Sequence, residues 1–424
     1  MREPDPVTAV LNQTVLADSG NAVDADAALL DAVEACGAGW ALPELRRAAA
    51  SFGADTMREH AVLANRHSPE LATHDRVGRR IEAVDFHPSW HALLGLAVEH
   101  GLVSRSWEGR QRGEHVARAA LMYLFAQTEA GTQCPVSMSH AVIPVLRRHQ
   151  GTVPEIAGQW LPKLVSRQYD PRDVPVADKR GVLFGMGMTE RQGGSDVRGN
   201  ITVAEPLDTA GAGRRYRVRG HKWFLSAPMC DAFLVVAQTE LGIGCFLVPR
   251  RTADGEINGL KLQRLKDKLG NRSNASSEVE FHDALGTLIG EPGAGIATII
   301  EMATYTRLDC QLATAGMQRR ALTLALRHAA QRHAFGGPLL EKPLMRAVLA
   351  DLAVEAEAAT LLSLRTAHYF DDSDDPRGAA LARLVTAAGK FHVCKRGALF
   401  AAETMEVFGG NGYVEELELA RIFR

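Results

Sequence analysis

The spacing of apolar residues divides the chain into three blocks. From about 24 to 180, apolar residues recur at i, i+3 and i+4, for example in 113–131, which predicts amphipathic helices. From about 181 to 288 the period is two, in short runs bounded by Gly, Asn, Asp and Pro, which predicts strands. Beyond about 294 the helical period returns. The longest helical segments are 296–333, 344–370 and 377–407.

This order predicts an α+β protein, because helices, strands and helices follow one another in blocks instead of alternating. Short strands without intervening helices are typical of a small antiparallel barrel, and long helices joined by short linkers are typical of an up-down bundle. We therefore expect a helical domain over 1–180, an antiparallel β-barrel over 181–288 and a four-helix bundle over 289–424.

Composition narrows the classes of function. Hydrophobic residues make up 46% of the 424 residues and charged residues 23%, as in an ordinary globular protein. The net charge of −2 disfavours nonspecific binding to polyanions such as DNA. No apolar run reaches the length of about 18 residues that spans a membrane, and the first residues lack the pattern of a signal peptide. The six scattered Cys lack a C-x-x-C pair, so we expect free thiols in the cytoplasm and no structural metal.

Several common motifs are absent. The glycines of 185–190 and 293–297 do not form G-x-G-x-x-G, so a Rossmann dinucleotide site is not expected. His87 and His91 have the i, i+4 spacing of a metal pair on a helix. Pro88 lies between them and no third ligand is near, so we interpret this segment as a helix start packed by Trp90.

Two stretches of the strand block carry candidate chemistry. In MTERQGGSDV (188–197), hydroxyls, a carboxylate and paired glycines follow an apolar strand, and they suit either a flat or anionic ligand or a turn with an Asx or Ser cap. In GHKWFLS (220–226), two adjacent aromatics and a hydroxyl suit either the wall of an aromatic cofactor site or simple core packing.

Two further stretches lie in the C-terminal block. RHAFGGPL (332–339) interrupts the helical pattern, and its Arg332 suits either a phosphate contact or a solvated helix end. FGGNGYVEE (408–416) is a glycine-rich loop after a long helix. It suits either a phosphate cradle made by backbone N–H groups or a helix C-cap and turn.

Together and in this order, the four stretches resemble the motifs of the acyl-CoA dehydrogenase superfamily over essentially the whole chain. Additional segments are similar to its AidB, or alkylation-response, branch. They are NQTVL (12–16), FHPSWH (86–91), TEAGTQCPVSM (128–138) and LKDKLGNRSNASSEVEF (265–281). The resemblance implies the superfamily's fold, bound FAD, a small-molecule substrate and a homotetramer whose FAD contacts partly cross a subunit interface.

The resemblance also implies which residues bind FAD. The flavin ring would lie near Met188, Thr189 and Phe224, with the Ser226 hydroxyl beside flavin N5. Ser195 would line the FAD and substrate cleft. The complete implied set is Met188, Thr189, Gly194, Ser195, Phe224, Leu225, Ser226, Arg332, Phe335, Gly409 and Gly410. Of these, the last four would contact the ADP half.

The chain also departs from the family pattern. Arg191 and Gln192 replace the usual residues after M-T-E, which puts an ordinary acyl-CoA fit in question. One family position for the catalytic base holds Thr306, and the other would lie beyond Arg424. We expect the helical turn to carry Asp309 away from the first position. We therefore assign no catalytic base, and we expect very low acyl-CoA dehydrogenase activity from this chain.

Two functions remain open at this point. The first is an FAD-dependent oxidoreductase whose substrate is an acyl-CoA or a nitrogen-containing compound. The second is an alkylation-stress protection protein that binds FAD and DNA with little dehydrogenase activity. The near-neutral charge and the absence of a basic C-terminal tail weigh against DNA binding by this chain.

Overall fold

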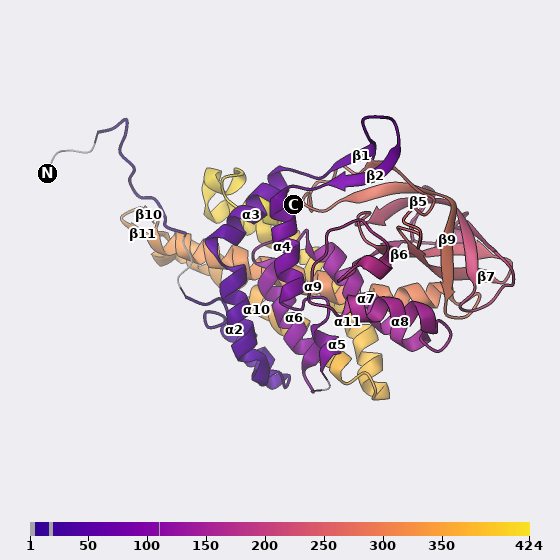
Figure 1. The fold of residues 1–424 in the computed structure, drawn as a ribbon. Helices are drawn as coiled ribbons and strands as arrows, with labels where there is room; N and C mark the ends of the chain where they lie inside the picture. The colour runs from indigo at the N-terminus through magenta and orange to yellow at the C-terminus, as the bar shows by residue number, and fades with distance from the viewer. Residues whose placement is uncertain (1–4, 17–19, 110) are drawn as a thin grey trace.

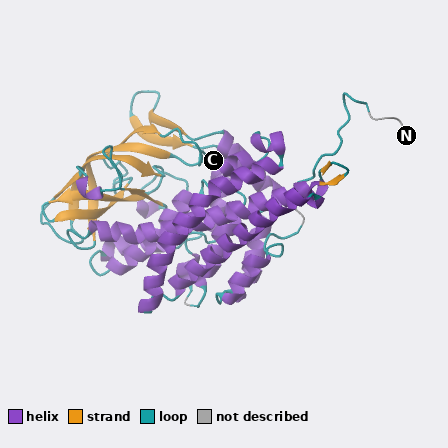
Figure 2. Ribbon diagram, turned by 180° about the vertical axis from the view of Figure 1, so that it is seen from behind, coloured by secondary structure: helices purple, strands orange, loops and turns teal. Residues whose placement is uncertain are grey.

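Helices make up most of the molecule, and a β-sheet region packs against one end of them (Figure 1). The computed structural model describes residues 5–16, 20–109 and 111–424. Figure 2 shows from behind that most strands gather at that one end. The observed fold is thus of the α+β class that the periodicity predicts.

The N-terminal region is mainly helical, as its apolar spacing predicts. Its helices are α1 (Ala27–Ala35), α2 (Leu42–Phe52), α3 (Asp55–Arg66), α4 (Pro88–Glu99), α5 (Arg105–Glu108), α6 (Glu114–Ala126), α7 (Gln133–His149) and α8 (Pro154–Leu164). The periodicity did not predict the hairpin of β1 (Glu70–His74) and β2 (Arg80–Asp85). Most hairpin residues are exposed or half-buried, so no apolar alternation marks them. The buried Glu82 carboxylate fixes the hairpin to the barrel by accepting a hydrogen bond from Leu262 N at 2.6 Å.

The middle region is a closed sheet. Its strands are β3 (Phe184–Gly187), β4 (Val203–Pro206), β5 (Arg215–Ser226), β6 (Ala232–Thr239), β7 (Gly242–Pro249), β8 (Leu260–Leu265) and β9 (Ser276–Ile289). The sheet closes into a barrel because β9, besides pairing with β7, also pairs with β5. We expected a wholly antiparallel barrel, and this expectation is wrong because two strand pairs are parallel. Strands β3 and β4 each pair with both β5 and β6. Each runs antiparallel to β5 and parallel to β6.

Strand β3 lies very close to its two neighbours. Its register pairs Met186 with Ser226 on β5, and Gly185 with Phe233 on β6. A Cβ at Gly185 would lie 2.5 Å from the Ser226 carbonyl oxygen and 2.6 Å from the Phe233 ring. Glycine at this position therefore allows the strand that precedes the first candidate loop to pack against β5.

The C-terminal region contains three long helices. Its elements are α9 (Gly295–Gln331), β10 (His333–Ala334), β11 (Gly337–Pro338), α10 (Pro343–Asp371), α11 (Pro376–Val407), the 3₁₀ turn Gly409–Tyr413 and α12 (Leu419–Phe423). Prolines begin α10 and α11, where a missing N–H costs nothing. The three long helices pack on one another, and α6 packs against α9 and α10.

Two apolar cores run through the molecule. The larger joins the N-terminal helices, the barrel and the first half of α9. The smaller joins the far end of α9 to α10 and α11. Among the described residues, no helix is both long and apolar enough to cross a membrane.

Candidate functional site

A buried ion pair holds the loop that follows β3. The Lys222 ammonium lies 2.6 Å from the Glu190 carboxylate, and both side chains are fully buried. Ile201 N and Thr202 N donate to the same carboxylate at 2.7 and 3.2 Å. Burial opposes its charge, but the hydrogen bond from Lys222 and those from residues 201 and 202 lower the pKa of Glu190 to about 2. Glu190 is thus an anchor of the loop.

The predicted flavin-loop residues lie beside β5. Trp223 N donates to Thr189 O at 2.8 Å, which joins the loop to the strand. A Cβ at Gly194 would lie 2.4 Å from Thr189 Oγ1, so the loop needs glycine there to fold this closely over Thr189. Asn200 Nδ2 holds the other side by donating to Met188 O at 2.9 Å. Gly194 and Ser195 themselves are exposed.

Strand β5 alternates between buried and accessible side chains. Leu225 is fully buried, whereas 43% of Phe224 is exposed and Ser226 is half-buried. The Lys266 ammonium lies 3.4 Å from the centre of the Trp223 ring and 4.8 Å from that of Phe224. Neither aromatic is core packing alone, because each presents part of its ring to a cation.

The predicted ADP-contacting residues cluster at the far end of α9. Arg332 ends that helix, and Phe335 lies at the tip of the β10–β11 hairpin with 94% of its surface exposed. The tip bends through positive φ angles of 52° at Phe335 and 82° at Gly336. Gly409 and Gly410 are also exposed and follow Phe408, whose ring stacks on His328 of α9 at 4.2 Å.

The N-terminal segment holds this hairpin. Asn12 Nδ2 donates to His333 O and His333 N donates to Asn12 Oδ1, both at 2.8 Å. The Arg332 guanidinium donates to Asn12 O. Reasoning from the sequence assigned no role to Asn12, although it opens the NQTVL segment that resembles the family.

The two predicted halves of the FAD site lie towards opposite ends of the folded molecule. Figure 1 places β10 and β11 at one end of the molecule and β5 and β6 towards the other. Along α9, Arg332 follows Thr306 by 26 residues, about 39 Å at 1.5 Å per residue. The structure therefore brings together the residues of each half but not the two halves.

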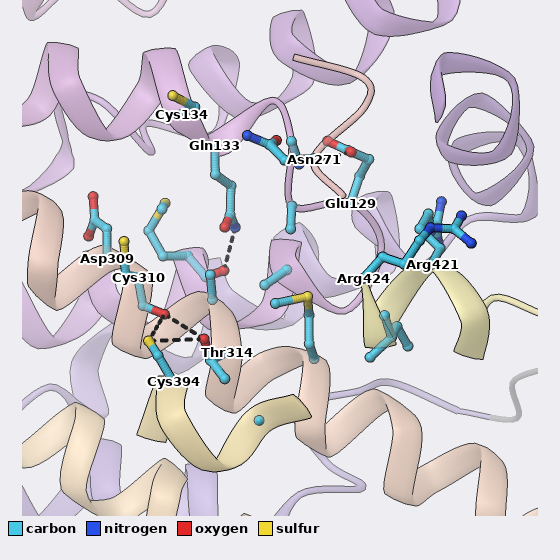
Figure 3. Close-up of a pocket in the computed structure, with 18 of the residues that line it drawn as sticks. Glu129, Gln133, Cys134, Asn271, Asp309, Cys310, Thr314, Cys394, Arg421 and Arg424 are labelled. Atoms are coloured by element: carbon cyan, nitrogen blue, oxygen red, sulfur yellow. Dashed lines mark hydrogen bonds between the residues drawn. The ribbon is translucent and has the colours of Figure 1, made fainter. Parts of the chain in front are cut away.

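A cavity of about 560 Å³ lies between the barrel and the helices (Figure 3). Helices α6, α7, α9 and α11 line it, together with Met186 of β3 and Ser226 of β5. Of the predicted cofactor residues, Ser226 lies on its wall. Thr306 lines it as well, but its hydroxyl donates to Ala303 O of its own helix at 3.0 Å.

Three carboxylates line the cavity, and each is held by other groups. Glu129 accepts hydrogen bonds from Thr132 N at 2.7 Å and from Ser273 Oγ at 2.8 Å. Asp309 lines the same cavity as Thr306, so our expectation that the helix turns it away is wrong, because residues three apart share one face of a helix. Its carboxylate forms a buried ion pair with Arg118, with Nη2 to Oδ2 at 2.8 Å. Glu418 pairs with Arg320 at 2.5 Å. Among the described wall residues, no carboxylate is poised as a general base.

Thiols also reach the cavity. Cys134, Cys310 and Cys394 line it, and Figure 3 shows the last two side by side across the α9–α11 contact. Burial raises the pKa of the Cys134 thiol. Because the thiolate is the nucleophile, Cys134 is unsuited to covalent catalysis at neutral pH.

The His87 and His91 pair has a structural role. His87 caps α4 by accepting a hydrogen bond from Ser89 N at 3.2 Å, and His91 Nδ1 lies 2.6 Å from the Tyr169 hydroxyl. Trp90 is buried against Phe86, with ring centres 3.8 Å apart. This arrangement matches the packed helix start that we inferred from the sequence.

Family models match the chain in three consecutive parts. They are the N-terminal domain of the adaptive response protein AidB over 12–171, the middle domain of acyl-CoA dehydrogenase over 185–284 and its C-terminal domain over 293–424.

Known proteins show the same relationship. Escherichia coli AidB is 47% identical over 98% of this chain and 76% of its own length. Acyl-CoA dehydrogenase family member 11 of Caenorhabditis elegans is 28% identical over 84% of this chain and 58% of its own. The structure of Caenorhabditis elegans ACDH-11 in complex with C11-CoA superposes with a TM-score of 0.88 at 25% identity, over 97% of this chain and 71% of that chain. This chain therefore belongs to the acyl-CoA dehydrogenase family, in its AidB branch.

Proposed function

We propose that the chain is an FAD-dependent oxidoreductase that holds the flavin against β5 and its substrate in the cavity. One observation carries the proposal: Ser226 ends the predicted flavin strand and also lines the cavity wall. Ser226 thus lies both on the strand proposed to contact the flavin and on the wall of a cavity that is large enough for a small molecule. Members of this family use FAD.

The barrel residues suit a flavin. Phe224 offers an accessible aromatic face, Thr189 and Ser195 offer hydroxyls, and Gly194 lets the loop backbone come close. Arg332 would pair with a phosphate, and Phe335, Gly409 and Gly410 present accessible surface and backbone to the ADP half. Met188 and Leu225 support this surface from within. When bound, FAD supplies a hydride acceptor.

Two classes of substrate are considered, acyl-CoAs and nitrogen-containing compounds. The family favours oxidation of a CH–CH bond in an acyl-CoA, which needs removal of an α-proton as the hydride leaves. Thr306 is a poor base, and the carboxylates of the described wall are already paired. We therefore expect this chain to act best on substrates that are already acidic or electron-rich, such as nitroalkanes, hydroxylamines or hydrazines.

The separation of the two FAD halves supports a homotetramer. Because Arg332 lies about 39 Å along α9 from Thr306, we propose that it reaches the flavin site of a second subunit. The exposed Phe335 and Leu344, at 94% and 79%, would then be buried between subunits. We further propose a cytoplasmic location and, from the 48 basic against 50 acidic residues, weak binding to duplex DNA.

Three measurements test the proposal. The purified protein should bind FAD noncovalently at about one per chain, and light scattering should give a tetramer. Anaerobic bleaching of the flavin band should then be followed with acyl-CoAs, nitroalkanes and amines. A protein whose melting temperature is unchanged by FAD would contradict the cofactor proposal. Fast bleaching by octanoyl-CoA would contradict the proposed substrate preference.

A further inference from the structure

Three buried polar side chains without complete hydrogen bonding line the cavity, in addition to the carboxylates described above. Gln318 is 2% exposed, Gln133 4% and Ser137 8%, and all three line the cavity described above. Within the described residues, both carboxamide atoms of Gln318, Oε1 of Gln133 and the Ser137 hydroxyl have no hydrogen-bond partner. The other carboxamide atom of Gln133, Nε2, donates to Met122 O at 2.8 Å (Figure 3), which leaves Oε1 as the atom without a partner.

The surroundings make this arrangement unusual. Apolar side chains such as Met122, Met138 and Met317 line the same cavity. A polar atom that is buried without a partner weakens folding, so native proteins seldom leave several in one place. Such a group is tolerated where a ligand supplies the missing hydrogen bonds.

We propose that the cavity binds a chain-like substrate that is mostly apolar and carries a neutral hydroxyl or amide group, and that Gln318 binds that group. This inference rests on the function proposed above, since it names the class of substrate. A carboxamide presents a donor and an acceptor side by side, which matches a group that both donates and accepts. The three side chains are neutral, so they offer no opposite charge to stabilise a charged group.

The position of Gln318 sets the length of the substrate. Gln318 follows Thr306 by 12 residues on α9, about 18 Å along the helix axis. Both residues line the cavity, and Ser226 enters it from the barrel. A substrate with its reactive carbon near Ser226 therefore needs a long chain to bring a polar group to Gln318.

The test compares matched pairs of probes on the FAD-loaded wild type by titration calorimetry. Each pair is an unsubstituted acyl-CoA and its ω-hydroxy analogue, from octanoyl to hexadecanoyl. At one chain length we expect the ω-hydroxy compound to bind about tenfold more tightly. Gln318→Leu should abolish that preference, and Gln318→Met provides a second variant of similar side-chain length.

Gln311 supplies a matched control. It lies on the same helix, is fully buried and also has an Oε1 without a partner among the described residues, but it packs against Gly389 of α11 outside the cavity. Gln311→Leu should leave the preference intact. The inference is overturned if the wild type binds neither member of any pair, binds both equally, or keeps its preference in both Gln318 variants.

FAD binding is measured separately in the same samples. A wild type without FAD affinity refutes the proposed function, whereas FAD-loaded protein without the ω-hydroxy preference refutes only the substrate class. Retention of FAD and melting temperature by the Gln318 variants would show that a lost preference reflects the cavity and not the fold.

Discussion

The two halves of the proposed FAD site are built in opposite ways. The barrel half is held from within by a buried ion pair, Lys222 with Glu190, and by hydrogen bonds to the carbonyl oxygens of Thr189 and Met188. The hairpin half is exposed and rests on the N-terminal segment through Asn12. The first half is therefore held within one chain, whereas we propose that a partner subunit covers the second.

Breaking the ion pair of the barrel half should have the largest effect. Lys222→Met leaves a buried carboxylate without its partner, so we expect a loss of about 3–5 kcal/mol in the free energy of unfolding, together with loss of FAD binding. Denaturant unfolding measures the first and flavin fluorescence the second.

The control for this variant lies on the same strand. Arg219 pairs with Asp283 at 2.8 Å, but both side chains are largely exposed. Arg219→Ala should leave stability and FAD binding unchanged. If Lys222→Met is as mild as this control, the ion pair does not organise the loop.

Removing the phosphate contact of the hairpin half should have the next largest effect. Arg332→Ala should weaken FAD binding by about 1.5–3 kcal/mol, or about 10- to 150-fold, because it removes a charge-assisted hydrogen bond. Arg332 is half-buried and its guanidinium donates to Asn12 O, so the melting temperature of the FAD-free protein should fall only slightly. Equal FAD affinity in variant and wild type, measured on tetramers, would contradict the assignment of Arg332.

Loosening the support of the hairpin should have a smaller effect. Asn12→Ala removes two hydrogen bonds to His333 and should weaken FAD binding by severalfold, up to about tenfold. The neighbouring Gln13→Ala is the control, since Gln13 bonds only to the nearby Leu11 O at 3.3 Å among the described residues. An identical response of the two variants would show that Asn12 does not position Arg332.

Lowering the pH should have the smallest effect, because it removes only part of the stability that the Glu190 carboxylate gives the barrel half. The lowered pKa of Glu190, about 2 against 4.5 in an unfolded chain, gives stability that is complete above about pH 4.5 and is lost as pH falls towards 2. The stability gap between wild type and Glu190→Gln should thus be constant from pH 7 to 6 and narrow by under about 1 kcal/mol at pH 4. If the stability difference between wild type and Glu190→Gln instead widens as the pH falls, the ionised form of Glu190 is not the form that stabilises the fold.

Local sequence patterns were sufficient for much of the fold. The segments predicted as 296–333, 344–370 and 377–407 became α9, α10 and α11 within a few residues, because a long amphipathic stripe specifies a helix before any packing is known. The glycine-rich and aromatic stretches likewise marked both halves of the candidate site. The domain boundaries at 180 and 288 and the individual FAD contacts stay predictions.

Only the tertiary structure decided how these parts are placed. The parallel pairing of β3 with β6, the β1–β2 hairpin fixed by Glu82 and the joining of Asn12 to His333 all connect residues that are distant in sequence. The same holds for Gln318 and Gln133, whose unpartnered atoms meet one cavity from two helices. Periodicity reports which face of an element is buried, but it does not report which other element buries it, because that depends on contacts between segments far apart in the chain.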